Sequence, residues 1–412
     1  MRRIAADRDF ALLWLARGVS TAGSAFTAVA LPALVYAQTS SPLLTSLLAA
    51  AVAAPYLVFG LIAGAQADRA DRRRIMVISD LINTVLLASI PLVALTGRTP
   101  IAQLLIVAWV SGSVSVWFDA ANFGALPALV PRERLGEANS RVYSTTTAVQ
   151  IGAPALAGVT IAAFGAQPTI AIDAVSFLLS AVFIGRIRKS LHVVRDPDAH
   201  RTSLLADIRE GLGFLVGEPT IRLFTALGSA SGFATGAVSG LLVVYAARRF
   251  GIVTGDGRLG LLFMAGAIGS FLGALLLPRI GARTDARVVT VAGMFTGPVL
   301  LVALAAVPAW WLSLLLLAAW GAATTLIIVN GITVRMSHTP DRLQSRVNVV
   351  GRMLTFGIFQ PLGALAAGLL AEHVPVGWAV TLCGLPMILA GLAGLVSLRR
   401  SGRGVEVPED AS

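Results

Sequence analysis

The sequence is poor in charged residues. Aspartate, glutamate, lysine and arginine together make up 13% of its 412 residues, whereas 56% are hydrophobic. A soluble globular protein has about 25% charged residues, so this chain has too few polar side chains to cover a surface in water. We expect a membrane protein whose surface is solvated by lipid.

Cysteine and lysine are nearly absent. The one cysteine, Cys383, excludes an intramolecular disulfide and a CxxC pair. The one lysine, Lys189, is preceded by Arg188, so the phosphate-binding loop GxxxxGK[ST] is missing. Hydrolysis of a nucleotide by that route is therefore excluded.

Patterns typical of enzymes and metal sites are also missing. The stretch GDGRLG at 255–260 matches GxGxxG, but no strand is expected before it and a membrane helix follows, so it fails as a dinucleotide site. The four histidines are scattered and lack partners at metal-ligand spacing. We expect no catalytic residues, no cofactor and no bound metal.

The charge that is present is mostly positive, with a formal net charge of +11. In a soluble protein this excess would suggest nucleic acid as a partner. A membrane protein instead keeps its basic residues in loops on one side of the bilayer. We therefore expect no nucleic-acid partner and interpret the basic residues as topology signals.

Long hydrophobic runs dominate the chain. A helix needs about 20 apolar residues to cross about 30 Å of hydrocarbon, and twelve such runs follow one another. The sequence predicts an all-α membrane protein with twelve transmembrane helices. The predicted spans are Phe10–Tyr36, Leu43–Ala67, Ile75–Leu95, Ile101–Leu126, Val142–Phe164, Thr169–Ile187, Leu223–Tyr245, Leu259–Leu277, Val288–Val307, Trp311–Val334, Val349–Leu370 and Trp378–Leu398.

Basic residues are distributed unequally over the predicted loops. Twenty-seven lie in the N-terminus, in the loops after each even-numbered span and in the C-terminal tail, and only four lie on the opposite side. This asymmetry predicts that both termini are cytoplasmic. An even number of spans agrees with that orientation.

A long polar stretch divides the spans into two sets of six. Within it, Ser203 is expected to open a surface helix, and Leu205, Ile208, Leu212 and Leu215 form one apolar stripe suited to lying on the bilayer. The predicted domains are an N-terminal half (1–187), a cytoplasmic linker with this amphipathic helix (188–219), a C-terminal half (220–398) and a cytoplasmic tail (399–412).

The two halves resemble each other. PRERLGEANSRVYSTTTAVQIGAPALAG begins at Pro131, and PDRLQSRVNVVGRMLTFGIFQPLGALAAG begins at Pro340. In each, a basic loop leads into a span that contains a second proline. Paired six-helix halves are typical of the major facilitator superfamily, in which the substrate site lies between the halves.

The loop after the second span strengthens this resemblance. GAQADRADRRR places Gly64, Asp68, Arg69, Arg72 and Arg73 in the spacing of the superfamily signature G-x-x-x-D-R-x-G-R-R, with an aspartate in place of the second glycine. The stretches ALPALVYAQTSSPL, PALVPRERLGEAN and AIDAVSFLLSA are similar to the macrolide-efflux and enterobactin-exporter branch of drug:proton antiporters. The resemblance covers nearly the whole chain and implies the major facilitator fold with two pseudo-symmetric halves.

The signature loop has two interpretations. Gly64 would let two helices approach closely, and the resemblance implies that Asp68 faces the positive N-terminus of span 11. It also implies that Arg72 pairs with an acid on span 4, for which Asp119 stands at the right depth. These contacts would form a latch in the outward-open state. Alternatively, the basic residues only anchor the loop in the cytoplasm.

Acidic residues inside the spans are the candidates for proton coupling, because a charge at mid-bilayer costs about 2.5–3.5 kcal/mol even on insertion scales. Asp119 and Asp80 are the two candidates. Alternatively, Asp119 belongs to the latch, and Asp80 neutralises a nearby cluster of basic residues. We interpret Asp173, in span 6, as a mostly structural residue.

Span 5 contains QIGAPALAG, which is similar to the antiporter motif of the superfamily's exporters. Gly152, Pro154 and Gly158 keep the pattern, but Ala153 departs from it. A proline kinks a helix, and small residues allow tight packing beside the kink. The motif is expected to seal the protein against proton leak, or else to serve ordinary helix packing.

Polar and aromatic side chains at mid-membrane depth are the expected lining of a central cavity. Arg17 either faces that cavity or snorkels to the cytoplasm, and the others either contact substrate or pack within the bundle. The candidates are Arg17, Trp117, Gln150, Trp320 and Asn330.

These observations and the resemblance predict a secondary active transporter in the inner (plasma) membrane of a bacterium. We expect proton-coupled export of an amphipathic drug or secondary metabolite by alternating access, by a monomer whose partners are substrate, protons and the lipid bilayer. The alternatives within transport are export of a siderophore or an endogenous metabolite, and import. Outside transport, the alternatives are a membrane-embedded sensor, an assembly partner or a membrane enzyme.

Overall fold

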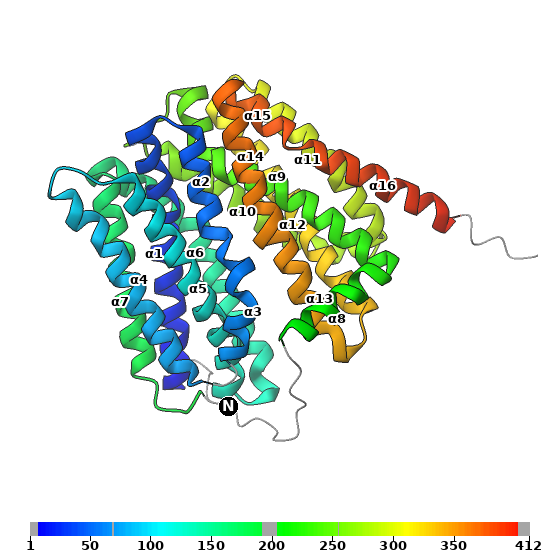
Figure 1. The fold of residues 1–412 in the computed structure, drawn as a ribbon, viewed down its shortest axis with the longest axis horizontal. Coiled ribbons are helices and arrows are strands. Elements are labelled where there is room, and N and C mark those ends of the chain that lie inside the picture. Colours follow the sequence, from blue (N-terminus) through cyan, green and yellow to red (C-terminus); the bar gives the residue numbers. More distant parts are fainter. Residues whose placement is uncertain (1–6, 68–69, 192–203, 254, 403–412) are drawn as a thin grey trace, which may run out of the picture.

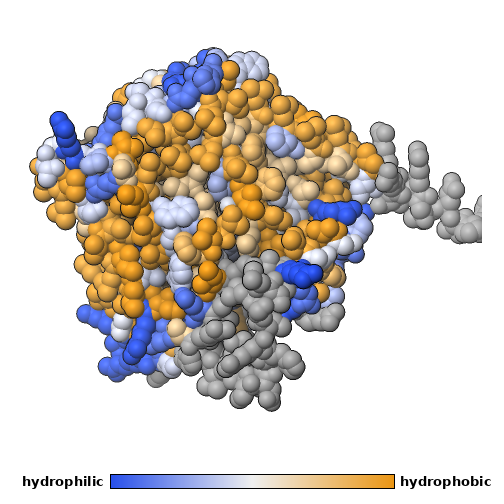
Figure 2. Space-filling model, in the orientation of Figure 1, coloured by the Kyte–Doolittle hydropathy of each residue, from blue (hydrophilic) through white to orange (hydrophobic). Residues whose placement is uncertain are grey.

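Helices are the only regular structure in the described chain. The computed structural model describes residues 7–67, 70–191, 204–253 and 255–402. In these residues, twelve helical segments are long and apolar enough to cross a membrane, which confirms the twelve predicted spans. Figure 2 shows a broad hydrophobic belt on the visible face, with polar residues gathered at its upper and lower edges. This is the surface of a protein that lipid surrounds.

The first six spans form one bundle, on the left in Figure 1. Its helices are α1 (Arg8–Thr39), α2 (Pro42–Ala53), α3 (Pro55–Ala67), α4 (Arg72–Ala94), α5 (Ile101–Leu129), α6 (Leu135–Phe164) and α7 (Ala166–Gly185). Helix α1 packs against α6 and α7, α4 packs against α5 and α7, and α3 packs against α5.

The last six spans form the second bundle. Its helices are α9 (Pro219–Phe250), α10 (Arg258–Gly281), α11 (Ala286–Ala306), α12 (Trp310–His338), α13 (Asp341–Arg352), the π-helix η3 (Met353–Phe359), α14 (Gln360–His373), α15 (Val376–Leu382) and α16 (Leu385–Gly402). Helix α9 packs against α14 and α16, α11 packs against α16, and α10 packs against α12. The packing of the first bundle is thus repeated, with α9 in the place of α1.

Two predicted spans are broken at prolines. The second span is divided into α2 and α3 just before Pro55. In the eleventh span, η3 directly precedes Gln360 and Pro361. A proline ring clashes with the carbonyl of residue i−4 in a regular α-helix, and one wider turn relieves this clash without ending the helix.

Helix α8 (Leu204–Gly217) differs from the predicted bilayer-surface helix. It packs against α13, where Leu215 is only 4% exposed and Glu210 forms an ion pair with Arg346. Leu212 is 42% exposed, and the side chains of Leu205 and Ile208 lie outside the described residues. The apolar stripe therefore has a protein partner at Leu215, because α13 offers a buried cluster of Leu343, Val347 and Val350 there.

Asp7 fixes the start of α1 to the end of the first bundle. One carboxylate oxygen accepts hydrogen bonds from the amides of Asp9 (3.1 Å) and Phe10 (3.4 Å), and the other accepts one from Lys189 Nζ (2.7 Å). Burial raises the pKa of Asp7, but the hydrogen bonds from Lys189 and the two amides outweigh it and lower the pKa overall. We call the end of the molecule where Asp7 and Lys189 lie the basic end, and we call the opposite end the far end.

Candidate functional site

A cavity of about 550 Å³ lies between the two bundles. This is within the range of about 300–1,000 Å³ that small-molecule sites occupy. Twenty of its 25 lining residues come from the N-terminal bundle. The C-terminal bundle contributes Ser239, Phe263, Arg352, Phe356 and Gln360.

The lining combines a large apolar surface with three charged side chains. Tyr56 and Phe177 add aromatic rings from the N-terminal bundle, and the charges belong to Asp119, Asp173 and Arg352. The Arg352 guanidinium carbon lies 5.3 Å from the centroid of the Tyr56 ring, so a cation–π contact joins the two bundles across the cavity. A molecule with an apolar body and a polar or charged group fits such a lining.

Asp119 forms its ion pair inside the N-terminal bundle. Arg17 Nη1 lies 3.5 Å from Asp119 Oδ1, and Arg352 is the second cation whose field reaches this carboxylate. The Arg72–Asp119 pair, which was predicted as part of an outward-open latch, is not formed in this conformation and stays a prediction for the other one. Arg72 Nη1 instead donates to the carbonyl oxygen of Gly124 at 2.9 Å. Asp119 precedes Gly124 by five residues on α5, so it lies about 7.5 Å deeper in the bundle.

The rest of the signature loop does not join the bundles in the described residues. Arg73 Nη1 donates to the backbone carbonyl of residue 187, at 2.7 Å, within the same bundle. The residue in place of the second signature glycine, Asp71, caps α4 by accepting from the Arg73 amide at 3.0 Å. No described atom lies within 4 Å of a Cβ built on Gly64, so the expected close helix approach is not formed there. Asp68 and Arg69 lie outside the described residues.

The antiporter-like motif lies at a crossing between the bundles. A Cβ on Gly158 of α6 would lie 2.6 Å from the carbonyl oxygen of Gly257, at the start of α10. A Cβ on Gly260 of α10 would collide with the carbonyl oxygen of Pro154. By contrast, no described atom lies within 4 Å of a Cβ built on Gly152. Pro154 and Gly158 thus form the contact, and Gly152 does not.

The bundles are held together at the far end by hydrogen bonds between side chains and backbone. Glu372 of α14 accepts from the Ser41 hydroxyl (2.9 Å) and from the Leu43 amide (3.1 Å). Arg248 of α9 donates from Nε to the Tyr36 hydroxyl (3.2 Å). We call these contacts the far-end closure. Figure 1 shows the bundles meeting at this end and diverging toward the start of α1.

None of the five side chains predicted to line the central cavity does so. Trp320 and Asn330 are buried in the C-terminal bundle, at 6% and 7% exposure. The Trp117 indole donates to a glutamine of α3 at 2.6 Å, and Gln150 is exposed on α6. Arg17 lies beside the cavity, in its pair with Asp119.

Three cavity residues that the sequence analysis did not propose share one helix face. Arg352, Phe356 and Gln360 follow one another at intervals of four residues. Residues at i and i+4 lie on the same side of a helix, so this spacing was the available signal. This spacing indicates that the eleventh predicted span, which begins near Arg352, presents one face to the cavity.

Asp80 and Asp173, the other two acidic residues of the predicted N-terminal spans, are both buried. Asp80 is 0% exposed on α4 and does not line the central cavity. Asp173 is 1% exposed on α7 and reaches the cavity wall.

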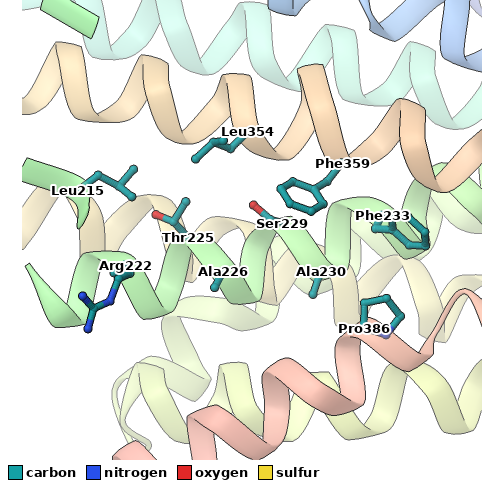
Figure 3. A pocket seen from close by; sticks show the side chains of 10 residues that line it. All are labelled: Leu215, Arg222, Thr225, Ala226, Ser229, Ala230, Phe233, Leu354, Phe359 and Pro386. Carbon is teal, nitrogen blue, oxygen red and sulfur yellow. The ribbon is translucent and has the colours of Figure 1, made fainter. Parts of the chain in front are cut away.

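A second cavity of about 430 Å³ lies within the C-terminal bundle, between α9, η3 and α16. Figure 3 shows Leu354 and Phe359 of η3 opposite Thr225 and Ser229 of α9, whereas Arg222 points away from them. The π-helix η3 therefore separates the two cavities, since Phe356 lines the central one.

Residues 13–354 match the family model of the Major Facilitator Superfamily. The chain belongs to this superfamily. It is therefore a multi-pass membrane transporter and not an enzyme, as the signature loop and the paired halves predicted.

Relatives of this transporter include efflux pumps. The chain is 29% identical to the multidrug efflux pump Tap of Mycolicibacterium fortuitum over 390 residues, which cover 93% of this chain and 94% of the relative. It is 26% identical to the macrolide efflux protein A of Streptococcus pyogenes over 179 residues, covering 43% of this chain and 44% of the relative. These matches agree with the drug-efflux branch that the sequence motifs resemble.

Solved structures share the fold at low sequence identity. A D323A mutant of the nucleoside transporter NupG matches with a TM-score of 0.81 at 11% identity, covering 94% of this chain and 99% of that chain. A bacterial homologue of the iron transporter ferroportin, in an inward-facing state, matches with a TM-score of 0.72 at 16% identity, covering 96% and 99%. The fold of the superfamily thus extends over nearly the whole chain.

Proposed function

We propose that this transporter exports an amphipathic drug or secondary metabolite across the inner membrane of a bacterium, in exchange for protons. The central cavity is the observation that carries the proposal. Its apolar and aromatic lining suits the body of such a compound, and Asp119, Asp173 and Arg352 suit its polar group. The efflux pumps among the relatives support export over import.

The positions of the contacts between the bundles support alternating access. The far-end closure and the Gly158–Gly260 crossing both lie in the far half of the molecule. With the basic end in the cytoplasm, as the distribution of arginines favours, this conformation is closed to the outside. Opening to the outside requires the far-end contacts to break and the basic ends to approach. The signature loop, from Gly64 to Arg73, would then act as the latch of that second conformation.

Proton coupling supplies enough energy for export. One charge moving down about 150 mV yields about 3.5 kcal/mol, which supports a concentration ratio of about 300. Asp119 is in a position to link proton and substrate, because it lines the cavity and lies beside Arg17. Protonation of this carboxylate would release Arg17, and a bound substrate would compete for the same carboxylate. Asp80 is the second candidate.

Everted membrane vesicles with an acid interior and a ΔpH-sensitive dye test the proposal. Macrolides, tetracyclines, cationic dyes and catecholate siderophores are added one at a time to vesicles with the wild type, Asp119→Asn or the exposed helix cap variant Asp285→Asn. We expect one class of compound to collapse the gradient with the wild type and with Asp285→Asn, but not with Asp119→Asn.

Other outcomes separate the alternatives. A response of Asp119→Asn equal to that of the wild type removes Asp119 from the coupling step and leaves export in place. A response to the siderophores alone replaces the drug by a metabolite. Sensitisation of intact cells by the transporter, where export predicts protection, indicates import. No response to any class, with folded protein in the vesicles, contradicts proton-coupled export of these compounds.

A further inference from the structure

A line of polar side chains runs between α4 and α7, inside the N-terminal bundle. Asp80 and Asn83 are three residues apart on α4, and Asp173, Ser176 and Ser180 are three and four residues apart on α7. Each spacing places its residues on one helix face, and α4 packs closely against α7. We call these five residues the polar seam. They are between 0% and 6% exposed.

Asp80 stands out in the seam because its carboxylate has no hydrogen-bond partner. Both of its oxygens are buried without a donor among the described residues, and Asp80 is 0% exposed. The Ser180 hydroxyl of α7 acts on this carboxylate, but the two groups do not form a hydrogen bond of regular geometry. The amide oxygen of Asn83 is a further buried acceptor without a donor. The Asp80 carboxylate is thus buried beside a hydroxyl group, with neither of its oxygens in a regular hydrogen bond among the described residues.

Neighbouring charges compensate Asp80 only in part, because the cost of burying the carboxylate outweighs the field of the nearby cation. Within the described residues, the charged groups that act on it are Arg17 of α1 and Asp173 of α7. Arg17 is engaged with Asp119, which is the only charged residue of α5. Asp173 carries the same sign of charge as Asp80. An ionised and unpaired carboxylate in a bundle interior is strongly unfavourable, so this site requires a bound cation.

A proton satisfies the site better than a metal ion. Hard metal cations take about six or more oxygen ligands, and among the described residues the Ser180 hydroxyl is the one uncharged side-chain oxygen shown to act on the Asp80 carboxylate. A proton converts one Asp80 oxygen into a donor, and the Ser180 hydroxyl can accept a hydrogen bond from it. The same change removes the unpaired charge.

We propose that Asp80 binds a coupling proton, and that the polar seam connects it to the central cavity through Asp173. Asp173 lines the cavity, and its Oδ1 accepts a hydrogen bond from Ser176 at 3.0 Å. Ser180 lies seven residues further along α7, about 10 Å nearer the basic end. This inference rests on the proposed proton coupling. It places one proton site within the N-terminal bundle, outside the central cavity that we propose for the substrate.

The helix packing around the polar seam supports a defined path for the proton between Asp80 and Asp173. Gly23 of α1 lies so close to α7 that a Cβ there would be 2.5 Å from Asp173 Oδ1 and would collide with the Ser176 hydroxyl. Helix α1 therefore closes the seam on its third side. Rigid-body motion of the N-terminal bundle leaves the seam intact, because all three helices belong to it.

Labelling with dicyclohexylcarbodiimide tests this site without knowledge of the substrate. This lipophilic reagent attacks carboxyl groups that hold a proton, and the labelled residue is found by peptide mass spectrometry. For the wild type in detergent, we expect Asp80 to be labelled, with a yield that falls about tenfold per pH unit above its midpoint. Ser180→Ala is expected to shift that midpoint without abolishing labelling. Asp285, which is exposed, serves as the unlabelled reference.

Two labelling results contradict the proposal. Absence of label on Asp80 at every pH, with label elsewhere in the chain, shows that this carboxyl holds no proton. Protection of Asp80 by sodium ions at constant pH, with no effect of potassium ions, shows that a metal ion occupies the site.

Transport by Asp80→Asn separates this inference from the proposed function. The neutral variant is expected to exchange substrate across vesicle membranes at the wild-type rate and to lose at least about tenfold in pH-driven accumulation. Accumulation equal to that of the wild type overturns the role of Asp80 and leaves proton-coupled export standing. If neither protein accumulates substrate in response to a pH gradient, the proposed function fails, and the labelling result on Asp80 still decides whether the site binds a proton.

Discussion

Glu372 caps a helix of the opposite bundle: its carboxylate accepts a hydrogen bond from the Ser41 hydroxyl at 2.9 Å, at the N-terminus of α2. The Leu43 amide donates to the same oxygen. A helix N-terminus favours a negative charge, and here that charge comes from α14. Helix capping and closure of the far end are therefore one interaction, and α2 loses this partner whenever the bundles separate.

Removal of this cap is expected to favour the conformation that is open at the far end. Glu372→Gln removes the charge, and loss of a cap costs about 1 kcal/mol, which corresponds to about a fivefold change in population. Spin labels at the exposed far-end positions 98 and 253, on a Cys383→Ser background, would report the distance between the bundles. Glu218→Gln, at a helix start where the side chain makes no cap, is the control. An unchanged distance distribution for Glu372→Gln would remove the cap from the closure.

A methyl group at the α6–α10 crossing is expected to push the bundles apart. Gly158→Ala places a Cβ 2.6 Å from a backbone oxygen that cannot move aside easily, and such overpacking costs about 1–3 kcal/mol. Gly152→Ala on the same helix meets open space and serves as the matched control. The same spin-label pair checks the result. Equal behaviour of the two variants would show that the crossing tolerates a side chain.

The contact between Arg352 and Tyr56 is expected to contribute to substrate affinity. Tyr56→Leu removes the ring from the cavity wall and from the Arg352 guanidinium, and a cation–π contact contributes about 0.5–1 kcal/mol. The dissociation constant of the transported compound should rise by about two- to fivefold, measured by fluorescence titration. Tyr56→Phe keeps the ring and should bind like the wild type. A loss in Tyr56→Phe equal to that in Tyr56→Leu would assign the effect to the hydroxyl.

Tyr245 is expected to stabilise the C-terminal bundle. Its side chain is 2% exposed, and its hydroxyl donates to the Leu304 carbonyl oxygen at 2.8 Å and lies 3.0 Å from the Ser313 hydroxyl. Tyr245→Phe leaves these buried groups without their partner, at a cost of about 1 kcal/mol. The melting temperature in detergent should fall, while Tyr143→Phe, on an exposed ring, should leave it unchanged. Equal melting temperatures of Tyr245→Phe and the wild type would show that the Ser313 hydroxyl replaces the lost hydrogen bond to the Leu304 carbonyl oxygen.

The twelve spans could be predicted from the sequence because length and hydropathy decide whether a segment crosses lipid. The sequence did not show in the same way which side of each helix faces the cavity, the core or the lipid. Trp320 and Phe356 are both aromatic residues inside predicted spans, yet Trp320 is buried in the core and Phe356 lines the cavity. Membrane helices are apolar on all sides, so hydropathy gives no signal for the direction that a side chain faces.

The partners of charged residues in this conformation were not accessible from the sequence either. The predicted pair of Arg72 and Asp119 belongs to the outward-open latch, and in this conformation α5 continues beyond its predicted end to Leu129. The carbonyl of Gly124 lies nearer to the basic end and accepts the arginine instead. The motif residues Pro154 and Gly158 could be identified from the sequence, whereas their partners at Gly257 and Gly260 could not, because the crossing joins helices of different bundles.

The unequal lining of the central cavity has an evolutionary consequence. Four-fifths of the residues that line the central cavity belong to the first bundle. The second bundle supplies Arg352, four other lining residues and one side of each contact between the bundles. Substitutions that change which compounds are tolerated are therefore expected to accumulate mainly before residue 180, and those that change the speed of the cycle to occur in either bundle. Laboratory selection for resistance to a new compound would reveal that division as a clustering of mutations in the first half of the gene.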